Sequence, residues 1–278
     1  MLVTRCGYAL RMAVSLTVLA SGSRGNSSIV ASGCTRILVD AGISARETFK
    51  RIKAVDADPH TLTAILISHE HSDHIDGLAM LAKRLAIPLY MTGATYEACR
   101  RLLRVKGGPA WKYDKIEFFC AGSRFEIGDI SVIPFTIPHD AVDPVAFTFS
   151  AEGVKVAIVT DLGYMPASVR HHIANCDVLM LESNHDLEML RVGPYPWSVK
   201  QRVMSRVGHL SNDALAQFFA SDYDGNAAFV ILAHLSEQNN HPEIAREAAE
   251  RALGCRRTLL HNRVVLASQS VPLQPLRL

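Results

Sequence analysis

The sequence predicts a single α/β domain, and three observations support this prediction. Apolar β-type segments alternate with amphipathic helical segments along all 278 residues. No linker, repeat or change of composition divides the chain, so one domain is expected over 12–278, after a possible extension at 1–11. Polar residues repeatedly follow the apolar strands, and the ends of strands are where open α/β sheets place their sites.

Thirteen β-type segments are expected in chain order. They lie at 14–20, 27–32, 35–39, 64–68, 88–92, 115–120, 124–127, 130–137, 145–150, 154–159, 177–182, 228–232 and 262–268. Continuous apolar runs such as 64–68 and 228–232 are typical of strands buried on both faces. Helical spacing of apolar residues predicts helices at 44–53, from Leu78 to Leu85, and at 94–105, 166–174, 198–206, 211–221 and 242–254.

Composition limits the class of protein. Hydrophobic residues make up 49% and charged residues 20%, as in ordinary globular proteins. The formal charge of +2, from 29 Lys and Arg against 27 Asp and Glu, excludes a strongly basic nucleic-acid coat but permits a local basic groove. No apolar run reaches the roughly 18 residues that cross a bilayer, so no membrane part is expected. The 12 histidines are numerous enough to suggest chemistry.

Two features bear on the cellular compartment. The segment 12–20, which follows Arg5 and Arg11, resembles a secretion signal, but its alternating pattern and the turn at 21–26 favour a strand that opens a hairpin. The six cysteines form no CxxC pair and show no metal-finger spacing. Scattered cysteines of this kind are typical of reduced, cytoplasmic proteins.

A histidine-rich segment directly follows the strand at 64–68 and reads His-Glu-His-Ser-Asp-His. Alternate residues of an extended backbone point the same way, so His69 and His71 can share one ion. Asp73 and His74, where the chain turns into a helix, can face a second ion. Zinc takes imidazole nitrogens and carboxylate oxygens, whereas adjacent imidazolium groups on a surface would only repel. The segment therefore predicts a metal site.

This segment, with Gly77 three residues further on, closely resembles the signature of the metallo-β-lactamase-fold hydrolases. The other motifs of that family follow in the expected order, at Asp40, His139, Asp161 and His234. The resemblance extends from about residue 14 to residue 269. It implies a four-layer αββα sandwich of the metallo-β-lactamase type.

The resemblance also implies the ligands of two divalent ions. One ion would be held by His69, His71 and His139, and the other by Asp73, His74 and His234. Asp161 would bridge both ions, and Asp40 would anchor the ligands without being one. Relatives with a di-iron redox centre have Glu at the position of His71, so nitrogen-rich ligation favours zinc here, with manganese second and iron still tolerated. No organic cofactor is expected.

Two such ions about 3.5–4 Å apart supply hydroxide from a bridging water and neutralise oxygens of the substrate. The predicted reaction is therefore hydrolysis, of an acyl bond or of a phosphate ester. Several longer segments, among them 19–26, 160–164, 181–190, 208–212 and 234–240, resemble the YycJ/WalJ subgroup of nuclease-like proteins. That resemblance implies phosphodiester cleavage with 5′-to-3′ exonuclease action on duplex DNA.

Further candidates lie near strand ends and a helix start. Asp73, His209, Asn184 and His185 are the predicted catalytic residues, and His209, Asn184 and Ser211 the predicted substrate contacts. His209 would donate to a phosphate oxygen or to the leaving group, near a helix start that Ser211 or Asn212 caps. The equally weighted alternative is that His185 and His209 only brace loops. Glu70, between two ligand positions, receives no role.

Two basic runs remain, one of Arg100, Arg101, Arg104 and Lys106, and one of Arg202 and Arg206. They could follow a nucleic-acid backbone, but a solvated helix face is the favoured interpretation. Two other functions stay open. One is acyl hydrolysis of a thioester or lactam, which the ligand set permits. The other is a non-catalytic regulatory metal protein, which is ranked last because every expected ligand is present. The sequence gives no indication of the oligomeric state.

Overall fold

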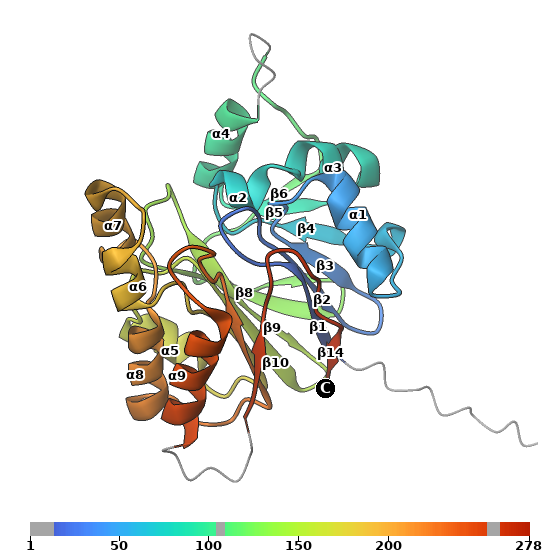
Figure 1. Cartoon of the computed structure of the whole chain (residues 1–278). Helices are drawn as coiled ribbons and strands as arrows, with labels where there is room; N and C mark the ends of the chain where they lie inside the picture. The colour runs from blue at the N-terminus through green and yellow to red at the C-terminus, as the bar shows by residue number, and fades with distance from the viewer. Residues whose placement is uncertain (1–13, 104–108, 255–261) are drawn as a thin grey trace, which may run out of the picture.

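Two β-sheets face each other and helices cover both outer faces in this computed structural model, which describes residues 14–103, 109–254 and 262–278 (Figure 1). The α/β class and the four-layer αββα arrangement expected from the sequence are confirmed. The possible extension at 1–11, together with Arg104 and Lys106 of the first basic run, lies outside the described residues.

The first sheet, sheet A, has the strand order β14-β1-β2-β3-β4-β5-β6. Its strands are β1 (Ser15–Ala20), β2 (Ser27–Ala31), β3 (Arg36–Val39), β4 (Ala64–Leu66), β5 (Leu89–Met91), β6 (Ile116–Phe118) and β14 (Leu276–Arg277). The strands from β14 to β3 are antiparallel, and those from β3 to β6 are parallel. The strand expected at 14–20 is thus confirmed as the first arm of a hairpin.

The second sheet, sheet B, has the order β13-β12-β11-β10-β9-β8-β7. Its strands are β7 (Phe125–Ile127), β8 (Ile130–Thr136), β9 (Val145–Ala151), β10 (Val154–Val159), β11 (Val178–Glu182), β12 (Phe229–Ala233) and β13 (Arg263–Leu266). Strands β7 to β10 are antiparallel, and β10 to β13 are parallel. In both sheets the parallel strands direct their carboxyl ends to the same edge, where sites form.

The helices divide between the two outer layers (Figure 1). Sheet A carries α1 (Ala45–Ala54), α2 (Ser72–Ile75), α3 (Leu78–Leu85) and α4 (Gly93–Leu102), and a short 3-10 helix, η1 (Pro59–Thr61), precedes β4. Sheet B carries α5 (Ala167–Ile173), α6 (Leu187–Val192), α7 (Trp197–Val203), α8 (Asn212–Ser221) and α9 (Pro242–Gly254). None of the helices in the described ranges is both long and apolar enough to cross a membrane.

Side-chain alternation along the strands builds the layers. In β4, Leu66 belongs to the core between the sheets, while Ile65 packs under the helices of sheet A. In β11, Met180 faces the same central core and Leu181 packs under the helices of sheet B. Because both faces of these strands are covered, their sequences are apolar without interruption, as the pattern predicted.

The helix expected from Leu78 to Leu85 is confirmed as α3, but several other elements were not expected. The short helix α2 precedes α3, and the two are separated at Gly77, whose N–H donates to the carbonyl of Ala41 at 2.8 Å and whose added Cβ would lie 2.0 Å from the carbonyl oxygen of Ile43. Strand β14 was not expected, because two residues are too few to show a period. Helix α6 was not expected either; Asp186 caps it by accepting a hydrogen bond from the N–H of Met189.

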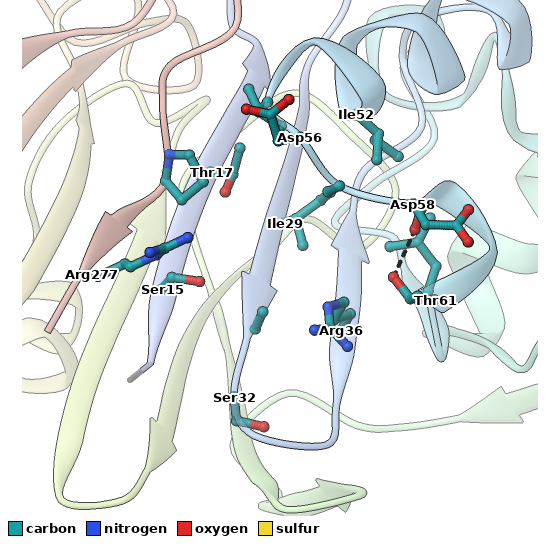
Figure 2. Close-up of a pocket in the computed structure, with 15 residues that line it drawn as sticks. Ser15, Thr17, Ile29, Ser32, Arg36, Ile52, Asp56, Asp58, Thr61 and Arg277 are labelled. Atoms are coloured by element: carbon teal, nitrogen blue, oxygen red, sulfur yellow. Dashed lines mark hydrogen bonds between the residues drawn. The ribbon is translucent and has the colours of Figure 1, made fainter. Parts of the chain in front are cut away.

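A hollow of about 520 Å³ opens on the outer side of sheet A, beside α1 (Figure 2). Thr17, Ile29, Arg36 and Arg277 are among the residues that line it. None of the site residues expected from the sequence lines this hollow, so the chemistry must be sought elsewhere.

Candidate metal centre and catalytic cavity

Three of the residues expected at the site lie just after strands and have an unusual backbone conformation. Asp40 follows β3, Asp161 lies just past β10 and His234 follows β12, and their φ angles are 59°, 62° and 54°. Such left-handed conformations cost a non-glycine residue roughly 1–2 kcal/mol. Strain of this kind gathers at functional sites, because it aims side chains where a regular strand would not.

One group of candidate ligands consists of His69, His71 and His139, which each offer a ring nitrogen within 4.8 Å of the others. Nε2 of His139 and Nδ1 of His71 are 3.2 Å apart. Nδ1 of His139 faces the carbonyl oxygen of Gly208 at 3.2 Å, and Nδ1 of His69 faces the hydroxyl of Ser68 at 3.0 Å. The second nitrogen of His69 and of His139 is thereby left for a metal ion.

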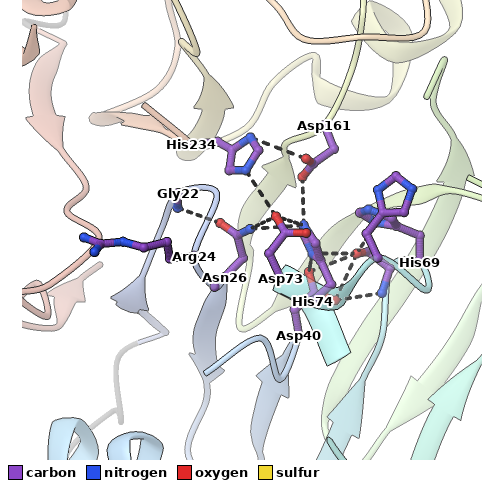
Figure 3. Close-up of polar contacts among 12 residues, drawn as sticks. Gly22, Arg24, Asn26, Asp40, His69, Asp73, His74, Asp161 and His234 are labelled. Carbon is purple, nitrogen blue, oxygen red and sulfur yellow. Dashed lines mark hydrogen bonds and ion pairs between the residues drawn. The ribbon is translucent and has the colours of Figure 1, made fainter. Parts of the chain in front are cut away.

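A second group consists of Asp73, His74, Asp161 and His234, again within 4.8 Å of one another (Figure 3). Nε2 of His74 lies 3.2 Å from Oδ2 of Asp161, and Nε2 of His234 lies 3.5 Å from Oδ2 of Asp73. The fold therefore brings together all seven residues that the family resemblance named as ligands.

Asp40 holds His74 in place without joining either group. Its Oδ2 accepts a hydrogen bond from Nδ1 of His74 at 2.8 Å, and its Oδ1 accepts one from the N–H of Ser68 at 2.8 Å. Because a carboxylate only accepts, Nδ1 of His74 carries a proton, and Nε2 is the ring nitrogen left to face the metal site. This is the anchoring position expected for Asp40.

Glu182, the last residue of β11, plays the same part for two other imidazoles. It is fully buried, and its Oε1 accepts from Nδ1 of His209 at 2.8 Å and from Nδ1 of His234 at 2.7 Å. Its Oε2 accepts from the N–H of Leu162 at 2.9 Å and of Leu210 at 3.1 Å. Four hydrogen bonds satisfy this buried carboxylate and fix both rings.

Asn26 orients Asp73 from the loop after β1. Its side-chain amide donates to Oδ2 of Asp73 at 3.1 Å, while its own oxygen accepts from the N–H of Gly22 at 2.9 Å. Sequence reasoning assigned no role to Asn26 or Glu182. A signal existed for Glu182, because a carboxylate at the end of a strand buried on both faces must find partners there.

Three buried atoms in the centre have no hydrogen-bond partner among the described residues: Nε2 of His69, Oδ2 of Asp161 and Nε2 of His234. Leaving a buried polar atom unpaired costs about 1–3 kcal/mol. All three are nitrogen or carboxylate oxygen, and all belong to the candidate ligands. The residues present therefore fit a divalent metal ion that would satisfy these atoms.

Electrostatics support the same conclusion. Burial and the neighbouring His74 hold the pKa of His69 well below its ordinary value, so the ring is neutral and one of its two nitrogens is free of a proton. Burial opposes the charged forms of His74 and His234, but nearby carboxylates, Asp161 foremost, raise the pKa of both well above the ordinary value. Protons on these rings balance the carboxylates, and bound cations would replace them.

A cavity of about 300 Å³ opens onto these residues. It is lined by Ser23, His71, Ser72, Asp73, Asp161, Arg202, His209 and His234. Among the described residues of the two basic runs, Arg202 alone contributes to this lining, whereas Arg100 on α4 pairs with Glu97 at 3.0 Å, as on a solvated helix face. Glu70 points away, and its Oε1 accepts from the N–H of Val142 at 2.8 Å.

Asn184, His185 and Ser211 do not line the cavity. The amide of Asn184 donates to the carbonyl of His234 at 2.8 Å, and the hydroxyl of Ser211 caps α8 by accepting from the N–H of Ala214 at 3.1 Å. His185 is 1% exposed and forms a β-bridge with Ser211. Substrate contact by these three residues stays a prediction, and their geometry favours the alternative of loop bracing.

Comparison with known proteins places the chain in a family. A sequence model described as the beta-lactamase superfamily domain matches residues 35–234. Exodeoxyribonuclease YycJ of Bacillus anthracis is 38% identical over 242 residues, which are 87% of this chain and 90% of that protein. Exodeoxyribonuclease WalJ of Streptococcus pneumoniae serotype 2 is 36% identical over 230 residues, which are 82% and 84% of the two chains.

Solved structures agree at the level of the fold. The metallo-β-lactamase-fold protein YhfI of Bacillus subtilis matches with a TM-score of 0.70 at 19% identity, covering 94% of this chain and 99% of that one. The family match, the two curated relatives and the convergent histidines and aspartates all lead to one assignment. The chain belongs to the beta-lactamase superfamily, among the hydrolases of the metallo-β-lactamase fold, with YycJ and WalJ as relatives.

Proposed function

We propose that this protein is a dinuclear metal-dependent phosphodiesterase that degrades DNA as a 5′-to-3′ exonuclease. The observation that carries the proposal is the convergence of seven ligand side chains, three of them with unpaired buried atoms, beneath a cavity with an arginine in its wall. The curated relatives named exodeoxyribonuclease supply the substrate class.

The proposed ligand sets follow the two groups described above. His69, His71 and His139 would hold one ion, and Asp73, His74 and His234 the other, with Asp161 between the two groups. Five imidazoles among the ligands favour zinc, with manganese second. Two such ions activate water at neutral pH and neutralise phosphate oxygens. Cytoplasmic location remains part of the proposal.

His209 is the proposed proton donor. Its Nδ1 is fixed by Glu182, and its side chain lines the cavity with 22% of its surface exposed, so Nε2 is the nitrogen available to a substrate. From this position it can donate to a non-bridging phosphate oxygen or to the leaving oxygen. Asp73, fixed by Asn26, lines the same cavity and contributes a carboxylate beside the reacting group.

The test combines metal content with three substrate classes. We expect two ions per chain by elemental analysis, and progressive release of nucleotides from the 5′ end of an end-labelled duplex. A thioester and a chromogenic lactam, assayed in parallel, should be turned over slowly or not at all. Preference for either acyl substrate would instead support acyl hydrolysis, and a metal-loaded protein inert on all substrates would support a regulatory role.

A further inference from the structure

We propose that Arg202 binds a phosphate of the DNA backbone, and that Asp140 occupies the position of that phosphate until substrate arrives. This inference rests on the proposed nuclease function. It assigns a substrate contact to the α7 segment, for which the sequence favoured an interpretation as a solvated helix face.

Arg202 is the only lysine or arginine among the described residues that line the catalytic cavity. The rest of the lining is made of hydroxyls, imidazoles and two carboxylates. A phosphodiester that enters needs a partner of opposite charge, and a guanidinium fits a phosphate with two parallel hydrogen bonds. Arg202 supplies that partner.

The present partner of Arg202 is a single carboxylate oxygen. Its Nε donates to Oδ2 of Asp140 at 2.5 Å, and no hydrogen bond of its two terminal nitrogens occurs within the described part of the chain. The side chain of Arg202 is 62% exposed, so solvent screens the pair and a change of partner costs little. The two terminal nitrogens of the guanidinium are therefore available to donate to a ligand.

Asp140 lies close to the first group of candidate ligands. Its Oδ1 is 3.6 Å from Nε2 of His139 and 4.0 Å from Nε2 of His71. An anion beside these imidazoles stands where a phosphate oxygen would approach the centre. The carboxylate of Asp140 therefore lies between His139 and His71 on one side and Arg202 in the cavity wall on the other. A bound phosphate would contact the same groups.

Helix α7 presents Arg202 from a fixed base. Lys200, two residues earlier and so on the opposite face of the helix, donates to the carbonyls of Arg191 at 2.7 Å and Gly193 at 2.8 Å. A Cβ at Gly208 would lie 2.2 Å from the carbonyl oxygen of Arg202, so the following loop packs tightly against the end of the helix. Only the side chain of Arg202 has to move when its partner changes.

Variants of both partners separate phosphate binding from a purely structural salt bridge. The holoenzymes of Arg202→Ala, Arg202→Lys, Asp140→Asn and Arg206→Ala are compared with the wild type on end-labelled duplex. The dissociation constant for a duplex with phosphorothioate linkages is measured by fluorescence anisotropy. Arg206 is the matched control, because its guanidinium stacks on Tyr164 at 4.1 Å and does not line the cavity.

We expect Arg202→Ala to weaken DNA binding and raise KM by about 10- to 100-fold, as the loss of a charged bidentate contact predicts, with a smaller change in kcat. Arg202→Lys should restore only part of the affinity. Asp140→Asn should leave binding unchanged or tighten it by about 2- to 5-fold, because a competing anion is removed. Arg206→Ala should change affinity by no more than about twofold.

Equal weakening by Asp140→Asn and Arg202→Ala would overturn the inference, since a structural salt bridge fails alike from either side. An effect of Arg202→Ala no larger than that of Arg206→Ala would overturn it as well. Metal content and melting temperature of each variant show whether the centre and fold survive. A wild-type protein that cleaves no DNA would contradict the proposed function itself, whereas the variant pattern in an active enzyme judges Arg202 alone.

Discussion

His209 and Glu182 form a hydrogen bond of 2.8 Å between Nδ1 and Oε1 at the wall of the catalytic cavity. The bond turns the other ring nitrogen of His209 toward the space a substrate would fill. Burial alone would lower the pKa of His209, but the charge of Glu182, this hydrogen bond and the charge of Asp161 together raise it above its ordinary value. A side chain held in this way is suited to donate a proton.

Replacing His209 by Ala should lower turnover of DNA by about 10²- to 10⁴-fold, the usual contribution of a general acid. Bound metal should remain at the wild-type level, because the two proposed ligand sets do not include His209. Single-turnover kinetics and elemental analysis measure the two quantities. Loss of metal from this variant would instead make His209 a ligand, in the group that it forms with Asp161, Glu182 and His234.

Glu182→Gln should impair both rings that the carboxylate holds. The neutral amide keeps the shape of the side chain but weakens two charge-assisted hydrogen bonds, so we expect turnover to fall at least 10-fold and metal affinity by about 10- to 100-fold. Glu70→Gln is the matched control, because Glu70 contacts Val142 rather than the centre. Titration with zinc measures the metal affinity of both variants, and steady-state kinetics measures their turnover. Equal effects of the two substitutions would show that the role assigned to Glu182 is wrong.

Chelation should abolish activity and lower the melting temperature. The unpaired nitrogens of His69 and His234 and the unpaired oxygen of Asp161 regain partners only when a cation binds. At a metal concentration 100 times the dissociation constant, binding to the native state adds about 2.7 kcal/mol per site, which is about 5–10 °C for one site in a chain of this size. Differential scanning calorimetry with and without zinc or manganese measures the shift; coincident melting curves would contradict it.

Gly42→Ala should destabilise the protein by about 1–3 kcal/mol through overpacking. A Cβ at this position would lie 1.7 Å from the carbonyl oxygen of Asp73, so the loop that carries the ligands must shift. Gly93→Ala provides the contrast, because no atom lies within 4 Å of its added Cβ. Urea unfolding and metal content of both variants test the difference, and equal stability of the two would refute it.

The free energy of unfolding should decrease at acidic pH, and His185 should account for part of that decrease. Burial lowers the pKa of this ring to about 4, whereas the unfolded chain titrates near its ordinary value of 6.5. Between these values the unfolded state binds more protons than the native state, so the free energy of unfolding decreases as pH falls. The loss from pH 7 to pH 5 is about 2 kcal/mol for this residue.

His185→Gln removes that titration. The metal-free variant should therefore lose about 2 kcal/mol less than the metal-free wild type over the same interval, as urea unfolding at the two pH values would show. An unchanged pH dependence would mean that His185 is protonated in the native state.

The sequence predicted the parts of the site that are encoded locally. His69, His71, Asp73 and His74 stand within one short segment, so extended geometry alone suggested how they divide between two ions. His139, Asp161 and His234 are far apart in the chain, and only their order and their place after strands identified them. The structure gathers them with the local cluster because both sheets direct these strand ends to one edge.

The supporting contacts could not be predicted in the same way. Glu182 bonds to His209, which is 27 residues away in the sequence, and to His234, which is 52 residues away. Contacts at such separations produce no periodic pattern from which they could be predicted. Likewise, nothing in the sequence showed that the ring of His185 would be buried, or that the side chain of Arg202 would line the cavity. These outcomes depend on how α6, α7 and the loops after β11 pack together, which is a tertiary property.

The two sheets each supply part of the centre, and the last contribution comes late. The group of His69, His71 and His139 is complete once β8 and the loop after it have been made, but the second group waits for His234 after β12. A chain still emerging from the ribosome therefore lacks a member of the second group of candidate ligands until most of its length has been translated.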